Sequence, residues 1–278
     1  MKKLLSMLIA SLFGFAYANG THSFKVGDIE LIALKVVDSN MDKSILLNPD
    51  DEIVQKVMSD NQNPSSVNTF LLKTKDELIL IDTGYESKGD LIKNLKAVGV
   101  TTEQINTILI THMHGDHIGG LINEGKKVFE NAKVLIAKDE LQYWLNKHTK
   151  RSELAKEVNS IYGQSVQTFS WNENISANIK PLKAVGHTPG HTFFEITSNG
   201  EKIVIVADVV HVLSVQVAKP SMSVVYDTDP IQAAKTREEY FKKFADEKTK
   251  IAGMHIKFPG VGYILENGKN SYKFEAVE

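Results

Sequence analysis

Three histidines and one aspartate occur within six residues of a single stretch, THMHGDHIGG, which runs from Thr111 to Gly120. In an extended segment the first two histidines point to the same side, because side chains alternate with a period of two. The glycine after them permits a sharp turn, so the aspartate and third histidine can reach a second cation nearby. The stretch therefore predicts half of a metal site rather than a polar loop that happens to be rich in histidine. Its four candidate ligands are His112, His114, Asp116 and His117.

The other half of such a site has to come from elsewhere in the chain. There are no cysteines, so only histidine, aspartate and glutamate can ligate a metal ion. Zinc accepts nitrogen and oxygen donors in a roughly tetrahedral arrangement, and catalytic sites keep one position for water. Three more polar positions qualify as ligands, and one carboxylate could bridge two ions. They are His187 in GHTPGH, Asp208 in VADVVH and His255 in GMHIKFPG.

These side chains share a local context, because each follows a predicted strand. Hydrophobic runs and alternation predict strands before Asp82, His112, His187, Asp208 and His255, with KIAGMHI as the last strand. Helical spacing predicts helices over 49–60, 87–98, 154–161 and 229–245. Strands come first, then alternating strand–helix units, then a hairpin, so we expect an α/β fold in which a sandwich of sheets is covered by helices. Loops beyond strand ends usually carry the chemistry in such folds.

The ordered set of ligands resembles the metallo-β-lactamase-fold hydrolase superfamily. The segments LIDTG before the histidine motif and GHTPGHT after it also match, so the resemblance covers essentially the whole mature chain. It implies a four-layer αββα sandwich that holds two Zn²⁺ ions or other divalent transition metals per chain. It also implies that one metal is held by His112, His114 and His187, and the other by Asp116, His117 and His255, with Asp208 bridging both.

Such a pair of ions predicts hydrolysis. Two cations a few ångströms apart lower the pKa of a shared water toward neutrality, so that a bridging hydroxide can attack an electrophilic carbon or phosphorus. Asp116 is the candidate catalytic residue, since it could orient this hydroxide and shuttle its proton. The chain has no Gly-x-Ser-x-Gly elbow.

Further residues are candidates for supporting roles. Asp82 is expected to accept a hydrogen bond from the histidine loop, and His191 and His211 lie beside ligand loops, where they could orient ligands. An aromatic wall for substrate binding is expected from Phe129, Tyr143 and Trp144, with burial in the core as the alternative for these aromatic residues.

Several segments look most like the branch that contains methyl parathion hydrolase and related exported lactonases, among them SSVNTFLLKT and ADVVHVLSVQ. This likeness implies a lactone or aryl ester substrate, with phosphotriesters as a side activity. N-acyl-homoserine lactonases usually have a tyrosine where this chain has His211. True β-lactamases of the fold mostly lack an aspartate at position 208, so β-lactams are not expected as main substrates. The alternatives are a thioesterase like glyoxalase II and a non-catalytic periplasmic metal-binding protein.

The first 18 residues predict a secretory signal peptide. Two lysines precede an apolar run and a small-x-small sequence, Ala16-Tyr17-Ala18; an uncleaved anchor is the alternative. Cleavage would leave a hydrolase domain over 19–278 that is periplasmic or secreted and has no membrane contact. Its 30 basic against 34 acidic residues argue against a nucleic-acid partner and leave a small-molecule substrate. Relatives often dimerise, so a homodimer is also expected.

Overall fold

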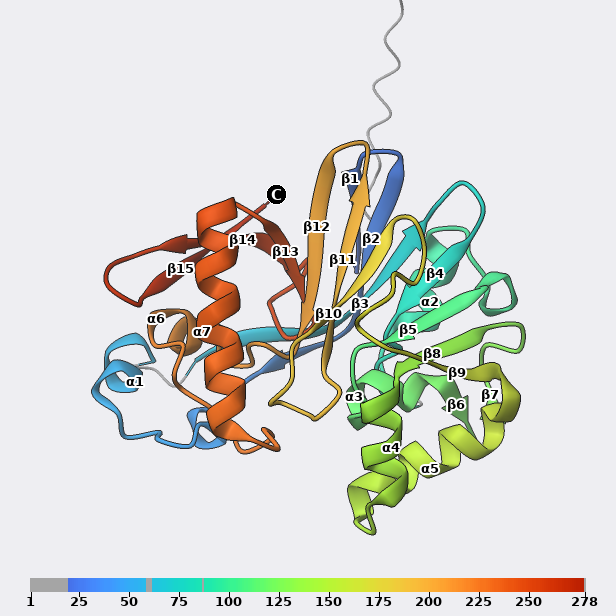
Figure 1. Cartoon of the computed structure of the whole chain (residues 1–278), viewed down its shortest axis with the longest axis horizontal. Helices are drawn as coiled ribbons and strands as arrows, with labels where there is room; N and C mark the ends of the chain where they lie inside the picture. The colour runs from blue at the N-terminus through green and yellow to red at the C-terminus, as the bar shows by residue number, and fades with distance from the viewer. Residues whose placement is uncertain (1–19, 59–61, 87, 278) are drawn as a thin grey trace, which may run out of the picture.

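Two β-sheets lie face to face in the computed structural model, which describes residues 20–58, 62–86 and 88–277 (Figure 1). The predicted signal peptide over 1–18 lies outside the described residues. The first sheet has seven strands in the order β1-β2-β3-β4-β5-β8-β9, and the second has six in the order β10 to β15. The first comprises β1 (Thr21–Val26), β2 (Ile29–Asn40), β3 (Pro64–Lys73), β4 (Leu78–Ile81), β5 (Thr107–Ile110), β8 (Lys133–Ala137) and β9 (Val166–Phe169). The second comprises β10 (Ile179–Lys183), β11 (Thr192–Ser198), β12 (Glu201–Ala207), β13 (Lys250–Gly253), β14 (Val261–Glu266) and β15 (Tyr272–Ala276).

Helices cover the outer faces of both sheets. On the first sheet lie α2 (Leu91–Ala97), α4 (Lys138–Asn146) and α5 (Lys150–Tyr162), and on the second lies α7 (Pro230–Glu247). Two short helices, α1 (Glu52–Val57) and α6 (Leu213–Ala218), pack on each other. A further turn, α3 (Gly115–Ile118), leads into a short hairpin of β6 (Ile122–Asn123) and β7 (Lys126–Lys127). The architecture is therefore the four-layer αββα sandwich that the family resemblance implied.

Three apolar layers hold the sandwich together. Phe70 and Leu109 of the first sheet meet Phe194 and Ile205 of the second in the layer between the sheets, and all four are fully buried. Each such side chain stabilises the fold by about 1.5–3 kcal/mol relative to an exposed one. The other two layers lie between the sheets and their helices; in one, Phe241 of α7 packs against the second sheet.

Parallel pairing brings the strand ends to one edge. Strands β4, β5, β8 and β9 run parallel to one another in the first sheet, and β12 runs parallel to β13 in the second. The residues that follow the carboxyl ends of parallel strands meet at one edge of a sheet. This arrangement gathers the polar loops of the two sheets at a shared edge.

The strand predicted from KIAGMHI is not the last one, which corrects the expectation from the sequence. The hairpin of β14 and β15 follows it and pairs antiparallel with β13. These strands are at the margin of the sheet, and their burial is mixed, so their apolar pattern is weak. Within the described residues, no helix is both long and apolar enough to cross a membrane.

Candidate metal centre

Every predicted ligand lies in a loop or turn just beyond a strand. His112 and His114 follow β5, and the turn of α3 then carries Asp116 and His117. From the second sheet, His187 follows β10, Asp208 directly follows β12, and His255 comes two residues after β13. The structure brings these seven side chains together in two groups, within which the ligand atoms lie within 4.8 Å of one another.

The first group has three imidazole nitrogens in close contact. His187 Nε2 lies 3.2 Å from His112 Nε2 and 3.0 Å from His114 Nδ1, and the latter two atoms are 3.0 Å apart. Asp208 Oδ2 completes the group at 3.5 Å from His112 Nε2 and 3.3 Å from His187 Nε2. Ligand atoms on a tetrahedral zinc ion, with bonds of about 2.0–2.1 Å, would be roughly 3.3 Å apart. The spacing therefore fits a shared cation.

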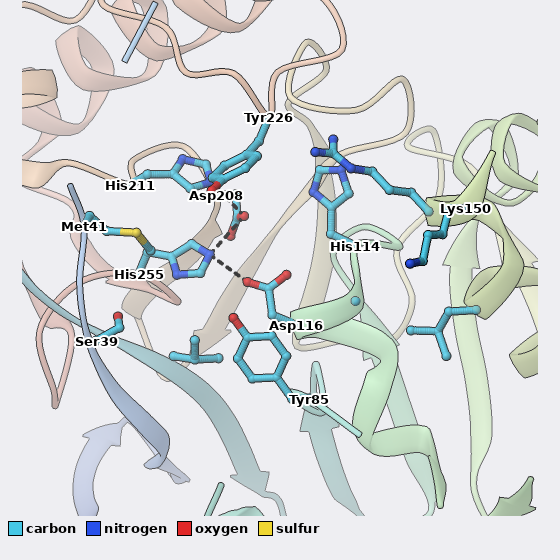
Figure 2. A pocket seen from close by; sticks show the side chains of 14 residues that line it. Ser39, Met41, Tyr85, His114, Asp116, Lys150, Asp208, His211, Tyr226 and His255 are labelled. Atoms are coloured by element: carbon cyan, nitrogen blue, oxygen red, sulfur yellow. Dashed lines mark hydrogen bonds and ion pairs between the residues drawn. The ribbon is translucent and has the colours of Figure 1, made fainter. Parts of the chain in front are cut away.

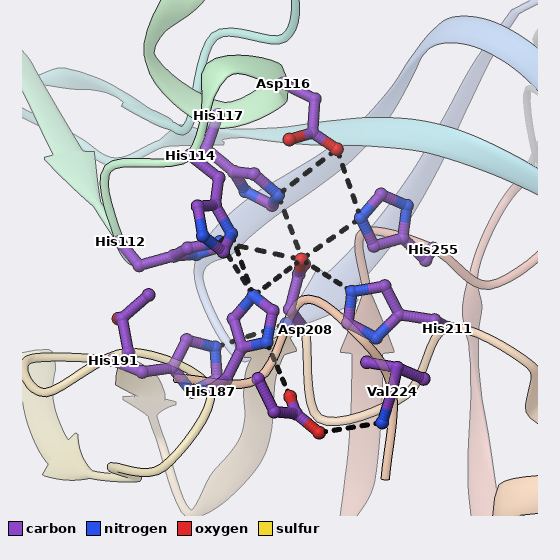
Figure 3. A network of polar contacts seen from close by, with 12 residues as sticks. His112, His114, Asp116, His117, His187, His191, Asp208, His211, Val224 and His255 are labelled. Atoms are coloured by element: carbon purple, nitrogen blue, oxygen red, sulfur yellow. Dashed lines mark hydrogen bonds and ion pairs between the residues drawn. The ribbon is translucent and has the colours of Figure 1, made fainter. Parts of the chain in front are cut away.

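The second group consists of Asp116, His117 and His255. Asp116 Oδ2 is 3.3 Å from His255 Nε2 and 3.7 Å from His117 Nε2. Asp208 reaches this group too, since its Oδ1 is 3.2 Å from His117 Nε2 and its Oδ2 is 3.2 Å from His255 Nε2. Figure 3 shows Asp208 at the centre, with imidazoles around it. Its carboxylate is thus placed to bridge two cations.

Buried polar atoms at the centre indicate a missing partner. His117 Nε2 and Asp208 Oδ1 are buried and lie 3.2 Å apart, yet neither atom makes a hydrogen bond with any described residue. Buried polar groups are almost always paired, so such atoms require an explanation, and an ion is one. Neutral imidazole nitrogens and carboxylate oxygens are also the donors that zinc accepts. The residues present therefore fit a pair of divalent cations.

The electrostatics divide the ligand histidines into two sets. Burial lowers the pKa of His112 and His114 well below the usual value, and neighbouring imidazoles lower it further, so both rings stay neutral. Burial alone would raise the pKa of Asp208, but the imidazoles of His117 and His255 outweigh it and hold that pKa well below its usual range. In His117, His187 and His255 the nearby carboxylates, Asp208 above all, outweigh burial: they raise the pKa of His117 well above its usual value and the pKa of His187 and His255 to about 9. A cation that binds these three imidazoles therefore has to displace their protons.

Two buried carboxylates orient ligand histidines. Asp82 Oδ2 is 2.7 Å from His117 Nδ1, and Asp82 also accepts hydrogen bonds from the backbone and hydroxyl of Thr111. Asp227 Oδ1 is 2.8 Å from His187 Nδ1, and its Oδ2 accepts from the backbone of Val224. In each case the carboxylate leaves the Nε2 atom free for a cation. The contact of Asp82 matches the prediction, whereas Asp227 had not been singled out in the sequence.

The other two candidate supporting histidines also lie beside Asp208. His191 Nδ1 donates to the carbonyl of Ala184, and its Nε2 accepts from the backbone N–H of Asp208 at 3.2 Å. Burial and the neighbouring His187 lower the pKa of His191 to about 3, which keeps it neutral. His211 Nε2 lies 3.1 Å from Asp208 Oδ2. Both rings thus position the loop that carries the central carboxylate.

A cavity of about 480 Å³ opens over the second group (Figure 2). Asp116 is the more accessible carboxylate, with 20% of its side chain exposed, against 2% for Asp208. Tyr85 lines the cavity beside Asp116, and it is a residue that sequence reasoning missed. Burial, together with the charges of Asp116 and Asp208, raises the pKa of Tyr85 to about 12, so its hydroxyl stays protonated and can donate a hydrogen bond.

The three predicted aromatic wall residues differ in their placement. Tyr143 and Trp144 line a second cavity that also borders His114, and the Trp144 ring lies edge-on to His114 with 5.5 Å between centroids. Phe129 is fully buried in the apolar core beneath the first sheet and lines neither of these cavities. Its expected place in a substrate wall is therefore corrected to core packing.

Comparison with known proteins gives matches along most of the chain. The family model of the Metallo-beta-lactamase superfamily matches residues 63–255. A crystal structure of the hydrolase AbOPH, described as in the beta lactamase superfamily, is 32% identical with a TM-score of 0.87, covering 93% of this chain and 98% of that one. AidC, described as a dizinc quorum-quenching lactonase, is 27% identical with a TM-score of 0.86, covering 93% of this chain and 98% of that one.

Curated relatives match over shorter stretches. Beta-lactamase-like protein 2 homolog of Caenorhabditis elegans is 36% identical over 91 residues, which is 31% of each chain. Atrochrysone carboxyl ACP thioesterase of Passalora fulva is 29% identical over 148 residues, which is 50% of this chain and 38% of that protein. The matched regions span between 31% and 60% of the length of the first such relatives.

Proposed function

Because the chain belongs to the metallo-beta-lactamase superfamily, we propose that it is a dinuclear-zinc hydrolase of lactones or esters. The observation that carries this proposal is the position of Asp208, whose carboxylate contacts both groups of candidate ligands. A purely structural ion would not require a second ion beside it or an accessible carboxylate such as Asp116. The likeness to AidC, a lactonase, and to AbOPH, a hydrolase, favours this class of substrate.

We assign the seven candidate ligands to two metal ions according to the two groups in which they lie. His112, His114 and His187 would hold one ion, and Asp116, His117 and His255 the other, with Asp208 between them. Bound divalent ions would lower the pKa of a water and polarise the substrate carbonyl.

Two residues of the cavity would then act on the substrate and on protons. Asp116 faces the cavity and would orient the attacking water and accept its proton. The protonated hydroxyl of Tyr85 would donate a hydrogen bond to a substrate oxygen.

Removing the central carboxylate tests the proposal. In Asp208→Asn, the loss of a shared anionic ligand should reduce the bound zinc from two ions per chain to one or fewer, and should lower kcat on lactones and aryl esters by at least about 100-fold. Inductively coupled plasma mass spectrometry on purified protein measures the metal content, and initial rates on a substrate panel measure the activity. His148→Gln is the matched control, because His148 is exposed and has no place in the cluster.

Several outcomes would contradict this function. They are full activity after dialysis against a chelator, two ions retained by the Asp208→Asn variant, or no turnover of any lactone or ester by the metal-loaded protein. A thioester such as S-lactoylglutathione belongs in the panel, because a thioesterase is among the matched relatives. Turnover of that substrate alone would favour the thioesterase alternative. Export by the predicted signal over residues 1–18 is part of the proposal and rests on its sequence pattern.

A further inference from the structure

Three cationic side chains lie beside the candidate metal centre, at the start of α5 and just before it. Lys150 and Arg151 line both cavities that border His114, and Lys147 lines the second. The two cavities share His114, Lys150, Arg151 and Tyr226, so they adjoin along this row of charges. Figure 2 shows the Lys150 amine directed into the cavity from the side opposite His255. We call Lys147, Lys150 and Arg151, with the cavity walls they form, the basic cleft.

These charges have no anionic partner in the part of the chain that the structure describes. Within the described residues, none of the three forms an ion pair with a carboxylate at 4.0 Å or less, although ion pairs are present elsewhere on the surface. The acidic residues that line the two cavities are Asp116 and Asp208, and the proposed function assigns both to the metals. The walls of the two cavities therefore offer no further carboxylate that could pair with the three cations.

Aromatic contacts place two of the cations over the cleft. The Arg151 guanidinium lies 5.9 Å from the centre of the Tyr226 ring, and the Lys147 amine lies 4.6 Å from the centre of the Tyr143 ring; both rings line the second cavity. Stability of α5 does not explain Lys150 and Arg151 in its first turn, because cations at a helix N-terminus oppose the helix dipole; Lys147 is the C-cap of α4, an end at which a cation is favourable. Positive charges that converge on a cavity raise the local concentration of anions and attract anionic ligands.

We propose that the basic cleft binds an anionic oxygen group of the substrate, a carboxylate or a phosphate, while the scissile ester or lactone lies at the metal centre. This inference rests on the proposed function and makes it narrower: the preferred substrates are esters or lactones that carry a negative charge away from the bond that is cleaved. Arginine and lysine both bind such groups through charge-assisted hydrogen bonds.

A matched pair of substrates tests the charge requirement. 3-Acetoxybenzoate and 3-acetoxybenzamide have the same shape, and only the first carries a negative charge; its meta carboxylate cannot attack its own ester. We expect the zinc-loaded protein to hydrolyse the benzoate with a kcat/KM at least about tenfold higher than that of the benzamide. Raising the salt concentration to 1 M should reduce this ratio, because partly exposed charges are screened.

In the double variant Lys150→Gln/Arg151→Gln, the ratio of kcat/KM for the benzoate to kcat/KM for the benzamide should fall by about tenfold. The fall should come mainly from a higher KM for the benzoate. The matched control Lys25→Gln/Lys243→Gln removes two exposed cations from β1 and α7 and should leave the ratio unchanged. An equal kcat/KM for the two substrates in the unmodified protein would overturn the inference while leaving the hydrolase function intact. An unchanged ratio in the double variant would also overturn it.

A binding measurement separates this inference from the hydrolase function. Isothermal titration calorimetry with 3-hydroxybenzoate and 3-hydroxybenzamide on zinc-loaded protein requires no turnover. Tighter binding of the benzoate that is weakened about tenfold in the double variant supports the basic cleft, even if neither ester is hydrolysed. If the benzoate binds equally well to both proteins, the carboxylate is held by the metals alone and the inference is wrong.

Discussion

Two histidines, one in each candidate ligand group, hydrogen-bond to a buried carboxylate. Asp227 contacts His187 in the first group, and Asp82 contacts His117 in the second. A carboxylate behind a ligand histidine fixes the ring orientation and makes the opposite nitrogen a better donor, and its loss commonly weakens metal binding by about 10–100-fold. The two pairs therefore allow each group to be perturbed separately.

Replacing these carboxylates one at a time should have site-selective effects. Asp227→Asn is expected to weaken zinc binding at the first group by about 10–100-fold, and Asp82→Asn should do the same at the second. Competition with a chromophoric chelator resolves the two binding steps in each variant. If both variants weaken both steps equally, or neither variant weakens any, the assignment of the residues to two ions is wrong. Unfolding of the metal-free variants, measured in parallel, reports any separate loss of stability.

The ligands and the supporting Asp82 were predictable from sequence, whereas the supporting Asp227 was not. Asp208 and His112 follow hydrophobic strands, so local pattern alone places them at strand ends. Asp227 lies 40 residues from its partner His187 in an irregular loop, where no periodicity marks it. The prediction that Phe129 forms part of a substrate wall was wrong for the same reason. Whether an aromatic residue faces a cavity or the core depends on packing between distant segments.

At the scale of elements, α4 joins the two ligand loops through one buried residue. Glu140 Oε1 accepts from Met113 N at 2.8 Å and from Trp144 Nε1 at 2.7 Å. Its Oε2 accepts from Thr188 Oγ1 at 2.7 Å and from Gly190 N at 2.8 Å. Met113 belongs to the loop that carries His112 and His114, and Thr188 and Gly190 belong to the loop that carries His187. The Glu140 carboxylate therefore hydrogen-bonds to both ligand loops from α4. The approach is close, since a Cβ at position 190 would lie 2.3 Å from Glu140 Cβ.

Changing this carboxylate to an amide should loosen the site. In Glu140→Gln the new NH₂ group would face two donors, leaving at least two buried hydrogen bonds unmade. We expect a loss of about 3 kcal/mol in the free energy of unfolding, together with weaker zinc binding at the first group. Urea denaturation of the metal-free and metal-loaded proteins measures both effects. The neighbouring Asp139→Asn is the control, because Asp139 is exposed and should change stability by less than about 0.5 kcal/mol. Equal stabilities of the two variants would refute this role of Glu140.

The elements predicted best were those with strong local patterns. The expected helix over 229–245 corresponds to α7 (Pro230–Glu247), where the Asp229 side chain accepts from Gln232 N and proline occupies the first turn. The C-terminal hairpin of β14 and β15 was missed, because its strands form the margin of the second sheet and alternate weakly. Pairing at a sheet margin is decided by the neighbouring strand, here β13, and not by the segment itself.

At the scale of the whole molecule, the candidate metal centre lies where the two sheets meet. The first sheet supplies the loop after β5, and the second supplies the loops after β10, β12 and β13. Bound ions would therefore connect the two halves of the sandwich in addition to the apolar layer between them. Because ligand binding to the folded state alone stabilises it, metal and fold stability are linked.

Metal removal should lower the stability of the entire sandwich and not of one loop. At zinc concentrations about 1,000-fold above the dissociation constant, binding adds about 4 kcal/mol to the free energy of unfolding, which for a chain of this size corresponds to roughly 10 °C in Tm. Thermal unfolding followed by circular dichroism, with and without chelator, measures this shift.

Hydrogen exchange tests whether the effect extends across both sheets. After chelation, the loops at 112–118, 187–191 and 208–211, which belong to different sheets, should lose their protection together. A chelated protein with an unchanged Tm, or loss of protection restricted to one sheet, would contradict a metal centre shared between the halves. Such a result would assign the sandwich's cohesion to its apolar layer alone, in which Phe70, Leu109, Phe194 and Ile205 are packed.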